Sequence, residues 1–391
     1  MTRLLGLDLF RAVAVFGMLV AHVGPSAWVP GEGGGTVLWQ WEVFHSRMPA
    51  MFAFAAGLSL TLGSRPSTPG DRAPIAPMLV RAALLALVGG LLTALGTPAV
   101  VILASFAVWF VLVIPFLRMG LRGLLVAAGV WAVAGPLLSF VLRRAFPDAG
   151  GFVWAGLVGG DYPTLTWMPF VLAGLAAGRL DLSSSRVRIR LGAVGAGIAA
   201  VAYGGSALFL ALGGRDLLLR AVAPSGGRDA AQEAARIFFR ESGVTDTGSW
   251  LWLVLPGPHS GSWADVFGCL GVSALLLAVL LPVGDWAARR TSGARELLRA
   301  PVRAVATMGA MVLSVYAAHI VGMAAITALT GHSFRPGQSE AMLFGFTAAL
   351  LVFSVLWLRR FRRGPLEELL ARATALTART GTRASAGSSR R

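Results

Sequence analysis

The chain has 391 residues, of which 56% are hydrophobic and only 13% are charged, and its formal net charge is +16 at pH 7. A chain of this length with so apolar a composition is not a water-soluble globular domain. We therefore expect it to fold in a lipid bilayer, which is both its solvent and its partner. Every basic residue is an arginine, and most of them lie in loops or in the tail. We therefore expect this charge to set the membrane topology and to contact anionic headgroups, and we expect no nucleic-acid partner.

Apolar runs of about 20 residues, long enough to cross roughly 30 Å of hydrocarbon, recur along almost the whole chain. They are continuous and rich in Leu, Ala, Val and Gly, which favours packed transmembrane helices over the alternating strands of a β-barrel. The predicted fold class is all-α, a polytopic integral membrane domain over residues 1–358 with about ten transmembrane helices. The expected spans are 8–24, 45–63, 77–96, 98–117, 121–142, 165–180, 190–213, 263–283, 306–330 and 340–358.

The first span carries two charged residues near its start. Asp8 and Arg11 are three residues apart, so they can pair on one face of the helix. Such a pair either fixes the helix end at the interface or contacts a polar ligand at the cytoplasmic side, and the spacing does not separate these roles. Both residues are candidate substrate-binding residues.

Two histidines flank the first outer loop. His22 closes the first span, and His45 opens the second together with Arg47. Because a short helix-loop-helix brings both imidazoles toward one outward cavity, either ring can take a proton from an acceptor hydroxyl or amine. The alternative is that both are simply polar residues at interfacial helix ends. We predict His45 as the general base, His22 as its assistant and Arg47 as a substrate contact.

Further polar residues fall on the same predicted side of the membrane. Asp161 and Tyr162 precede the sixth span, and His259 lies in a Pro- and Gly-rich stretch before the eighth. Turn formation and helix capping are the ordinary explanation for residues in such places. Their shared side makes them candidate substrate-binding residues.

The ninth span contains a histidine well inside the expected hydrocarbon. His319 follows a long apolar run, and Tyr316 lies one turn before it. The two side chains either line a buried polar path or pack against a neighbouring helix. We include both in the candidate substrate-binding set.

Two segments outside the spans are distinctive. The loop 214–262 contains an amphipathic stretch at 228–241, which predicts a helix on the outer membrane surface or a lid over a site. Residues 359–391 are rich in Arg, Thr and Ser and predict a largely disordered cytoplasmic tail. With both termini in the cytoplasm, most arginine clusters lie inside and the loop 214–262 lies outside, and Arg143 and Arg144 are the exceptions.

Several motifs that carry chemistry are absent from the sequence, among them GxxxxGK[ST], HExxH, CxxC and GxSxG. We therefore expect no metal site and no ATP-driven transport by this chain. The single cysteine, Cys269, lies in an apolar span, so it allows no internal disulfide and is a poor nucleophile.

The first span, RLLGLDLFRAVAVFGMLVAH, together with FAFAAGLSL in the second, resembles the opening of the heparan-α-glucosaminide N-acetyltransferase-like and domain-of-unknown-function-418 membrane proteins. Four further segments are similar to actinobacterial members in the same order: GDYPTLTWMPFVLAGLAAGRLDL, PHSGSWADVFGCLGVSALLL, PVRAVATMGAMVLSVYAAHIVG and FRRGPLEELL. The order of these segments carries the resemblance more than any one motif.

The resemblance implies a transmembrane acyltransferase, in which acetyl-CoA or another acyl-CoA is held at the cytoplasmic side and its acyl group passes to an acceptor on the far side. It also implies a catalytic histidine close to the first outer loop. That stretch here is the glycine-rich segment 31–36, which holds no histidine, so His45 or His22 takes the role in our prediction.

We therefore expect an N- or O-acetyltransferase of the cell membrane, with an acyl-CoA donor and a glycan-like extracytoplasmic or membrane-bound acceptor. The competing hypothesis is a transporter or exporter without covalent chemistry, which would use Tyr316 and His319 as a substrate or proton path. A membrane scaffold or sensor that signals through its Arg-rich tail is the third. The sequence leaves open the acceptor, the acyl chain and whether the protein forms a homo-oligomer.

Overall fold

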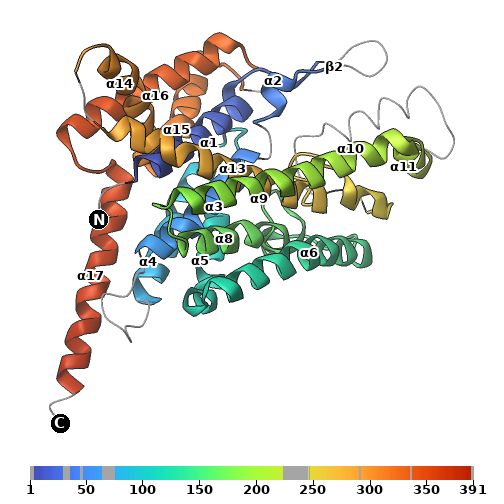
Figure 1. The fold of residues 1–391 in the computed structure, drawn as a ribbon, viewed down its shortest axis with the longest axis horizontal. Coiled ribbons are helices and arrows are strands. Elements are labelled where there is room, and N and C mark those ends of the chain that lie inside the picture. The colour runs from blue at the N-terminus through green and yellow to red at the C-terminus, as the bar shows by residue number, and fades with distance from the viewer. Residues whose placement is uncertain are drawn as a thin grey trace.

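The computed structural model describes residues 4–29, 36–44, 47–63, 75–222, 245, 247–289, 292–334 and 337–388. Helices account for most of them, and one two-residue antiparallel pairing joins Trp28 to Val37 and Val29 to Thr36. The elements in chain order (Figure 1) are α1 (Leu5–Val23), β1 (Trp28–Val29), β2 (Thr36–Val37), α2 (Trp39–Glu42), α3 (Arg47–Gly63), α4 (Ile75–Thr93), α5 (Leu103–Leu112), η1 (Ile114–Arg118), α6 (Leu121–Ala145), α7 (Phe152–Trp154), η2 (Ala155–Gly159), α8 (Thr164–Gly178), α9 (Ser185–Ala199), η3 (Ala200–Gly204), α10 (Gly205–Phe209), η4 (Leu210–Gly214), α11 (Arg215–Val222), η5 (Trp250–Val254), α13 (Trp263–Ala288), α14 (Ala294–Ala310), α15 (Val312–Thr330), α16 (Glu340–Arg360) and α17 (Pro365–Ser388).

Seven helices of the described chain are long and apolar enough to cross a membrane. They are Leu5–Val23, Ile75–Thr93, Leu121–Ala145, Ser185–Leu218, Trp263–Ala288, Val312–Thr330 and Glu340–Arg360. Two further apolar helices, α5 and α8, are shorter. The protein is thus an all-helical, multi-pass membrane protein, as predicted, while the expected count of about ten spans stays a prediction.

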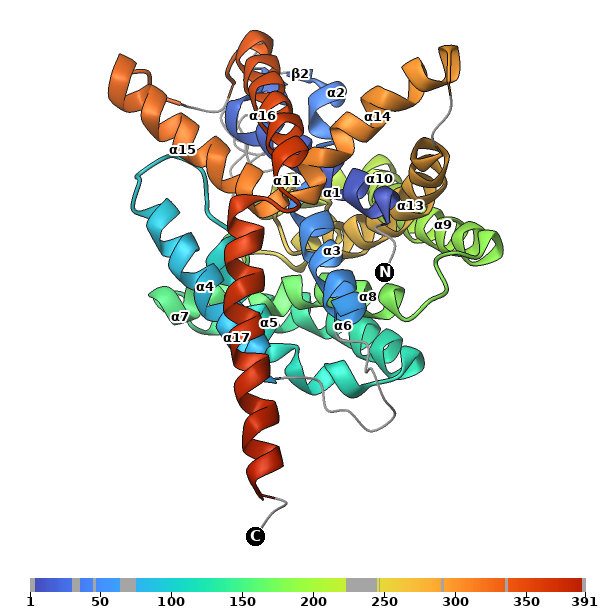
Figure 2. The same ribbon diagram turned by 90° about the vertical axis from the view of Figure 1, so that its left-hand side faces the viewer.

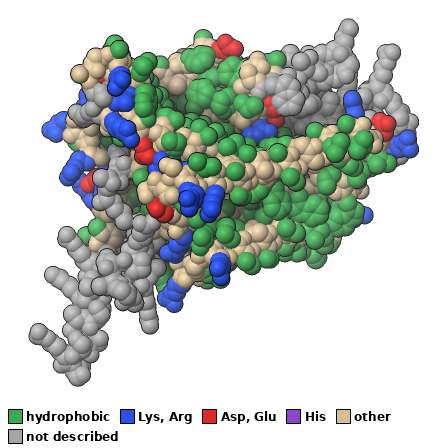
Figure 3. Space-filling model, in the orientation of Figure 1, with side chains coloured by type: hydrophobic (Ala, Val, Ile, Leu, Met, Phe, Trp, Pro, Cys, Tyr) green, Lys and Arg blue, Asp and Glu red, His purple; other side chains and the backbone are tan. Residues whose placement is uncertain are grey.

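The lipid-facing surface is visible in the exposure of large apolar side chains. Leu87 on α4, Val130 on α6 and Leu356 on α16 are all exposed, although water would disfavour each of them. Figure 3 shows the same property, because hydrophobic side chains cover most of the surface between the two ends of the molecule. This surface is suited to contact with hydrocarbon chains.

Helix α1 is central and packs against α3, α13, α14, α15 and α16. Glycines let its neighbours come close, as is usual where transmembrane helices pack without a hydrophobic driving force between them. A Cβ at Gly309 of α14 would overlap the carbonyl oxygen of Asp8 on α1. In a second close contact, α3 and α8, Gly57 and Gly174 each approach a backbone carbonyl of the facing helix.

Most arginines gather at one end of the molecule, which we call the basic end. It includes Arg188, whose guanidinium lies 2.5 Å from the Asp285 carboxylate, and Arg303, which bonds the backbone of Ala287. Figure 3 shows most of the visible Arg side chains in its left-hand half, where α17 also lies. In Figures 1 and 2, α17 runs across this end, roughly perpendicular to α6 and α9, and it packs against α4 and α15.

The two exceptions to the charge pattern, Arg143 and Arg144, lie at the far end of α6 from the basic end. Arg143 donates to the backbone and side chain of Thr245, and Arg144 donates to the Thr247 carbonyl at 3.2 Å. Local backbone acceptors therefore hold both guanidinium groups there.

The structure departs from the expected elements in three places. The span 306–330 is two helices, α14 and α15, because the backbone leaves the helical region at Met311 (φ −126°, ψ 46°). The span 98–117 contains only the ten-residue α5 and a 3₁₀ turn. Where we expected a largely disordered tail, residues 365–388 form helix α17, whose apolar side chains are in contact with the bundle. The predicted amphipathic segment 228–241 lies outside the described residues.

Candidate functional site

A cavity of about 1040 Å³ opens at the basic end of the bundle. Its walls come from α1, α3, α4 and α5, from the break between α14 and α15, and from α17. Four arginines line it, Arg11, Arg81, Arg362 and Arg363, against two carboxylates, Asp8 and Glu367. The lining therefore carries a net charge of +2 (four positive and two negative groups), which favours an anionic ligand.

Asp8 and Arg11 form the predicted pair on α1, with 3.2 Å between the Arg11 guanidinium and the Asp8 carboxylate. The second terminal nitrogen of Arg11 donates to the Ser59 hydroxyl on α3 at 2.5 Å. Asp8 is buried, so its charge is compensated within the protein rather than by water. The structure thus brings both residues into the cavity wall.

Arg81 on α4 contributes a cation to the wall of this cavity. Its guanidinium lies over the Phe110 ring, 5.4 Å from the centroid. Its Nε is buried without a hydrogen-bond partner, and no ion pair of Arg81 occurs in the part of the chain that the structure describes. A buried guanidinium costs free energy unless its donors are used, so Arg81 is prepared for an anion that enters the cavity.

The break at Met311 exposes the start of α15 to the same cavity. Val312 and Leu313 line the cavity, and the Glu367 carboxylate on α17 accepts hydrogen bonds from the backbone N–H groups of Leu313 (2.7 Å) and Ser314 (3.2 Å). The Ser314 hydroxyl donates to the same carboxylate at 2.5 Å. Glu367 thereby caps the helix that carries Tyr316 and His319.

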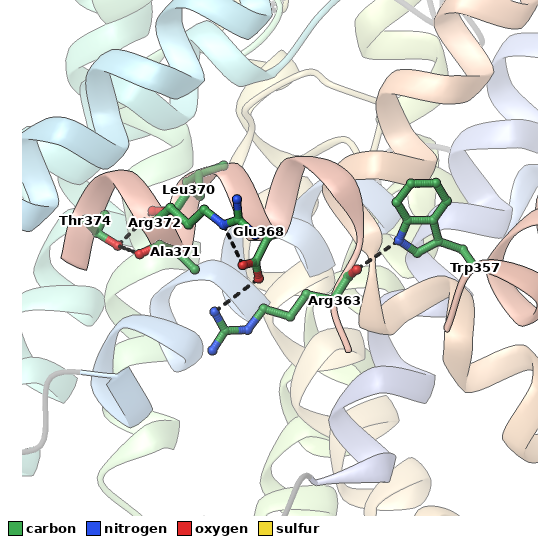
Figure 4. A network of polar contacts seen from close by, with 7 residues as sticks. All are labelled: Trp357, Arg363, Glu368, Leu370, Ala371, Arg372 and Thr374. Carbon is green, nitrogen blue, oxygen red and sulfur yellow. Dashed lines mark hydrogen bonds and ion pairs between the residues drawn. The ribbon is translucent and has the colours of Figure 1, made fainter. Parts of the chain in front are cut away.

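A second set of contacts holds α17 in place (Figure 4). Glu368 accepts from Arg372 at 2.8 Å and lies 3.6 Å from Arg363. The Arg363 carbonyl in turn accepts from the Trp357 indole at 2.9 Å, which ties α17 to the end of α16. The cavity wall made by α17 is therefore anchored at both α15 and α16.

Tyr316 closes the inner part of the cavity. Its hydroxyl accepts a hydrogen bond from the backbone N–H of Ile102 at 3.3 Å. One turn further along α15, the His319 ring packs edge-on against Tyr316 with 5.1 Å between centroids. Both side chains are buried, so the cavity leads to a polar group inside the bilayer.

His319 meets His22 of α1 at this depth. The His22 Nδ1 and His319 Nε2 atoms are 3.0 Å apart, and the rings stack with 5.2 Å between centroids. A hydrogen bond of this length needs one ring nitrogen with a proton and one with a lone pair. The pair joins residues 297 positions apart in the sequence.

The bond between the two rings is compatible with two arrangements of protons. In one, His22 donates through Nδ1 to the lone pair on Nε2 of His319, so that the lone pair of His22 lies on its own Nε2, the atom that a general base of this kind would use. In the other, His319 donates and His22 accepts.

Two of the outer-side candidates belong to one aromatic group. The Tyr162 ring packs edge-on against His259, with 5.5 Å between centroids, and both pack against Trp167 of α8. Tyr162 is buried, and Asp161 precedes it in the turn before α8. The structure thus brings Tyr162 and His259 together.

Arg47 belongs to a different group of residues. Its guanidinium lies 4.9 Å from the centroid of the Tyr203 ring and donates to the Glu42 carbonyl at 2.9 Å. Tyr203 in turn contacts Cys269, whose thiol donates to Asp265. Arg47 thus packs toward η3 and α13. The predicted general base, His45, lies outside the described residues.

Sequence reasoning missed the arginine and the carboxylate that distinguish the cavity. Arg81 is a lone charge inside an apolar run, which is a recognised sign of a functional residue in a membrane span. Glu367 follows the arginines at 359–363 and lies outside any apolar run, so nothing in the sequence indicated that it is functional. Its partners at the start of α15 are more than 50 residues away in the chain.

Family comparisons agree with the resemblance seen in the sequence. The family described as "Heparan-alpha-glucosaminide N-acetyltransferase, catalytic" matches residues 3–214, more than half of the chain. The family described as "Protein of unknown function (DUF418)" matches residues 257–377. No curated protein matches the chain. The cavity and the histidine pair each combine residues from both matched segments.

Proposed function

This chain belongs to the heparan-alpha-glucosaminide N-acetyltransferase catalytic family, and we propose that it is a transmembrane acyltransferase of the cell membrane. It moves an acetyl or related acyl group from a cytoplasmic acyl-CoA to a hydroxyl or amine acceptor, glycan-like or membrane-bound, that approaches from the far side. In this proposal the basic end faces the cytoplasm, in line with the arginine distribution.

The observation that carries the proposal is that the arginine-lined cavity reaches Tyr316, whose ring packs against His319 of the histidine pair. Arg11 and His22 are eleven residues apart on α1, about 16 Å at about 1.5 Å per residue. That distance is about half of the hydrocarbon thickness. In this proposal the acyl group is held in the cavity, and the acceptor meets it beside His22.

The residues present fit the anionic part of an acyl-CoA. Phosphate groups prefer guanidinium donors, and the cavity is lined by the guanidinium of Arg81, which has no ion pair in the described chain, and by those of Arg362 and Arg363. The apolar wall from α5, which includes Phe106 and Phe110, suits the rest of an extended acyl carrier. An acyl-CoA supplies a thioester whose carbonyl carbon is open to attack.

His22 acts as the general base in this proposal. Its Nε2 takes the proton from the acceptor hydroxyl or amine while the acceptor oxygen or nitrogen bonds to the acyl carbon. The carbon–sulfur bond then breaks, and the proton passes to the departing thiolate, so that an acylated acceptor and a free thiol result. In this proposal His319 is a positioning residue: its Nε2, 3.0 Å from Nδ1 of His22, accepts from that ring and so fixes its tautomer.

One structural observation also favours the competing function, a transporter without covalent chemistry. The cavity reaches buried Tyr316, which packs against buried His319, and buried polar residues inside a membrane span are typical of substrate and proton paths. In that case His319 and Tyr316 belong to a proton or substrate path. Uptake driven by a proton gradient into vesicles, with no thioester consumed, would favour this function.

The test uses membranes that contain the protein and acetyl-CoA labelled in its acetyl group. We expect label to move to a glycan, lipid or other acceptor, and free thiol to appear in equal amount. His22→Ala should abolish both, and His45→Ala, made in parallel, tests the base that the sequence predicts. Exposed Arg122, at the start of α6, provides the control variant Arg122→Met with wild-type activity. A His22→Ala/His45→Ala double variant as active as wild type would refute this mechanism.

A further inference from the structure

A second hollow lies on the outside of the bundle, and it shares no lining residue with the cavity described above. It is a groove of about 710 Å³ between the helical segment α9–η3–α10 on one side and α13 and η5 on the other. Its lining is almost entirely apolar and includes Ile198, Val201, Phe209, Trp250, Trp263 and Phe267. The volume lies within the about 300–1,000 Å³ typical of sites for small organic ligands.

This groove faces the hydrocarbon of the bilayer. The span Ser185–Leu218 has only 11% of its most apolar window buried in the protein, the lowest share among the seven spans. Val201 and Trp250, which line the groove, are both exposed. Lipid chains are therefore the molecules present at this surface at the highest concentration.

One polar side chain distinguishes the groove from an ordinary lipid-facing surface. Ser206 lines it and is only 4% exposed. Its hydroxyl has no hydrogen-bond partner in the described chain, although serines in helices usually donate to the carbonyl four residues earlier. A buried hydroxyl without a partner costs free energy, so a ligand that brings a carbonyl oxygen to this point gains a hydrogen bond.

The depth of Ser206 indicates which carbonyl that is. Arg188, paired with Asp285, marks the basic interface, and Ser206 follows it by 18 residues, about 27 Å at about 1.5 Å per residue. The hydrocarbon core is about 30 Å thick, so Ser206 lies near the ester carbonyls of the opposite leaflet. Trp250 and Trp263 also line the groove, and tryptophans are enriched at membrane interfaces.

The helix beside the groove has an unusual backbone. Two π-helical turns, η3 and η4, flank the five-residue α10 that carries Ser206, and such turns occur frequently at functional sites. Gly205 also lines the groove, and a Cβ added there would meet no atom within 4 Å. The space next to Ser206 is therefore open for a ligand.

We propose that this groove binds one acyl chain of a bilayer phospholipid from the leaflet opposite the basic end. The chain lies along the aromatic and aliphatic lining, and its ester carbonyl accepts a hydrogen bond from the Ser206 hydroxyl. The site does not depend on acyl transfer, and it exists whether or not the proposed function is correct.

The glycines of the same turn allow a clean test. Gly205→Leu adds a side chain at a residue that lines the groove, whereas Gly204→Leu, one residue earlier, adds the same side chain at a residue that does not line it; a Cβ at either position meets nothing within 4 Å. Both variants exchange glycine for leucine within the helix, so their effects on helix formation match. Circular dichroism and thermal melting establish that both are folded.

The measurement is photolabelling in liposomes by a phosphatidylcholine that carries a diazirine in one acyl chain, followed by peptide mapping. We expect label on peptides that contain 197–209 and 263–267, a loss of at least tenfold in Gly205→Leu and none in Gly204→Leu. Ser206→Ala should reduce the labelling by about fivefold, the effect of one ordinary hydrogen bond. A photoactivatable free fatty acid, which lacks the ester, should label weakly and should not respond to Ser206→Ala. Equal labelling of Gly205→Leu and wild type, or label spread evenly over all lipid-facing peptides, would overturn the proposal.

Discussion

Replacement of Arg81 by methionine separates a ligand-binding arginine from a structural one. Methionine keeps most of the length of the side chain and removes the charge. Arg81 makes no ion pair in the described structure, and its Nε has no hydrogen-bond partner, so the substitution removes no ion pair of the described chain and no hydrogen bond of that nitrogen. It removes the contact of the guanidinium with the Phe110 ring, worth about 0.5–2 kcal/mol, and it also removes the cost of burying a cation.

Two effects of opposite sign therefore follow from Arg81→Met. Protein stability should stay unchanged or rise, because the lost cation–π contact is offset by the relief of the buried charge. Binding of the acyl donor should weaken, because a hydrogen bond to a charged group contributes about 1.5–3 kcal/mol, which corresponds to roughly a 10- to 150-fold rise in KM. The value of kcat should change little, since Arg81 lies far from the reacting atoms in the proposed arrangement.

The assay measures acetyl transfer as a function of acetyl-CoA concentration, together with the melting temperature of the purified protein in detergent. Arg122→Met serves as the matched control, because Arg122 is exposed and does not line the cavity. The reasoning is refuted if Arg81→Met lowers the melting temperature by several degrees and leaves KM at its wild-type value. Arg81 would then be a structural residue.

Three further variants test individual contacts. His319→Gln should lower kcat about 10- to 100-fold and shift its pH profile while KM changes little, because a positioning residue sets the tautomer of the base; an unchanged kcat and pH profile would exclude that role. Glu367→Ala should lower the free energy of unfolding by about 0.5–2 kcal/mol, because α15 loses its cap. Glu367→Gln keeps an acceptor oxygen and should lose less stability. Thermal melting distinguishes the two variants, and equal losses of stability would show that the charge matters rather than the cap. Gly309→Ala should lower the free energy of unfolding by about 1–3 kcal/mol, because its Cβ would overlap the Asp8 carbonyl. Gly345→Ala is the control and should leave the stability of the protein unchanged, because the space around Gly345 is open. Equal melting temperatures of the two variants would contradict the close packing of α1 and α14.

The position of α17 shows where local sequence is a poor guide. Residues 359–391 read as a polar, Arg-rich tail because few of them are large and apolar. Their helix forms against α4 and α15, and Glu367 finds its partners at a helix start that exists only because α14 ends at Ala310. Neither the break nor the partner is encoded within the tail itself, so only the packed bundle decides the conformation.

The predicted site residues divide in the same way. Asp8 and Arg11 were predictable as a pair, because an i, i+3 spacing on a helix determines their proximity. The structure places His22 against His319, a pair that the sequence did not indicate, while His45, its expected neighbour, lies outside the described residues. Arg47, the predicted substrate contact, packs against Tyr203.

The amino-acid sequence by itself determined the solvent of this protein and its class of structure. A chain with 56% hydrophobic residues in long continuous runs must satisfy its backbone within helices inside a bilayer, and this requirement is local to each segment. The tertiary structure alone decided which polar groups meet. Arg81, Glu367 and His319 acquire their roles from partners on other helices, and a helix carries no record of which face its neighbours will cover. The lipid groove has the same origin, since its two walls come from segments about 60 residues apart that pack only in the folded bundle.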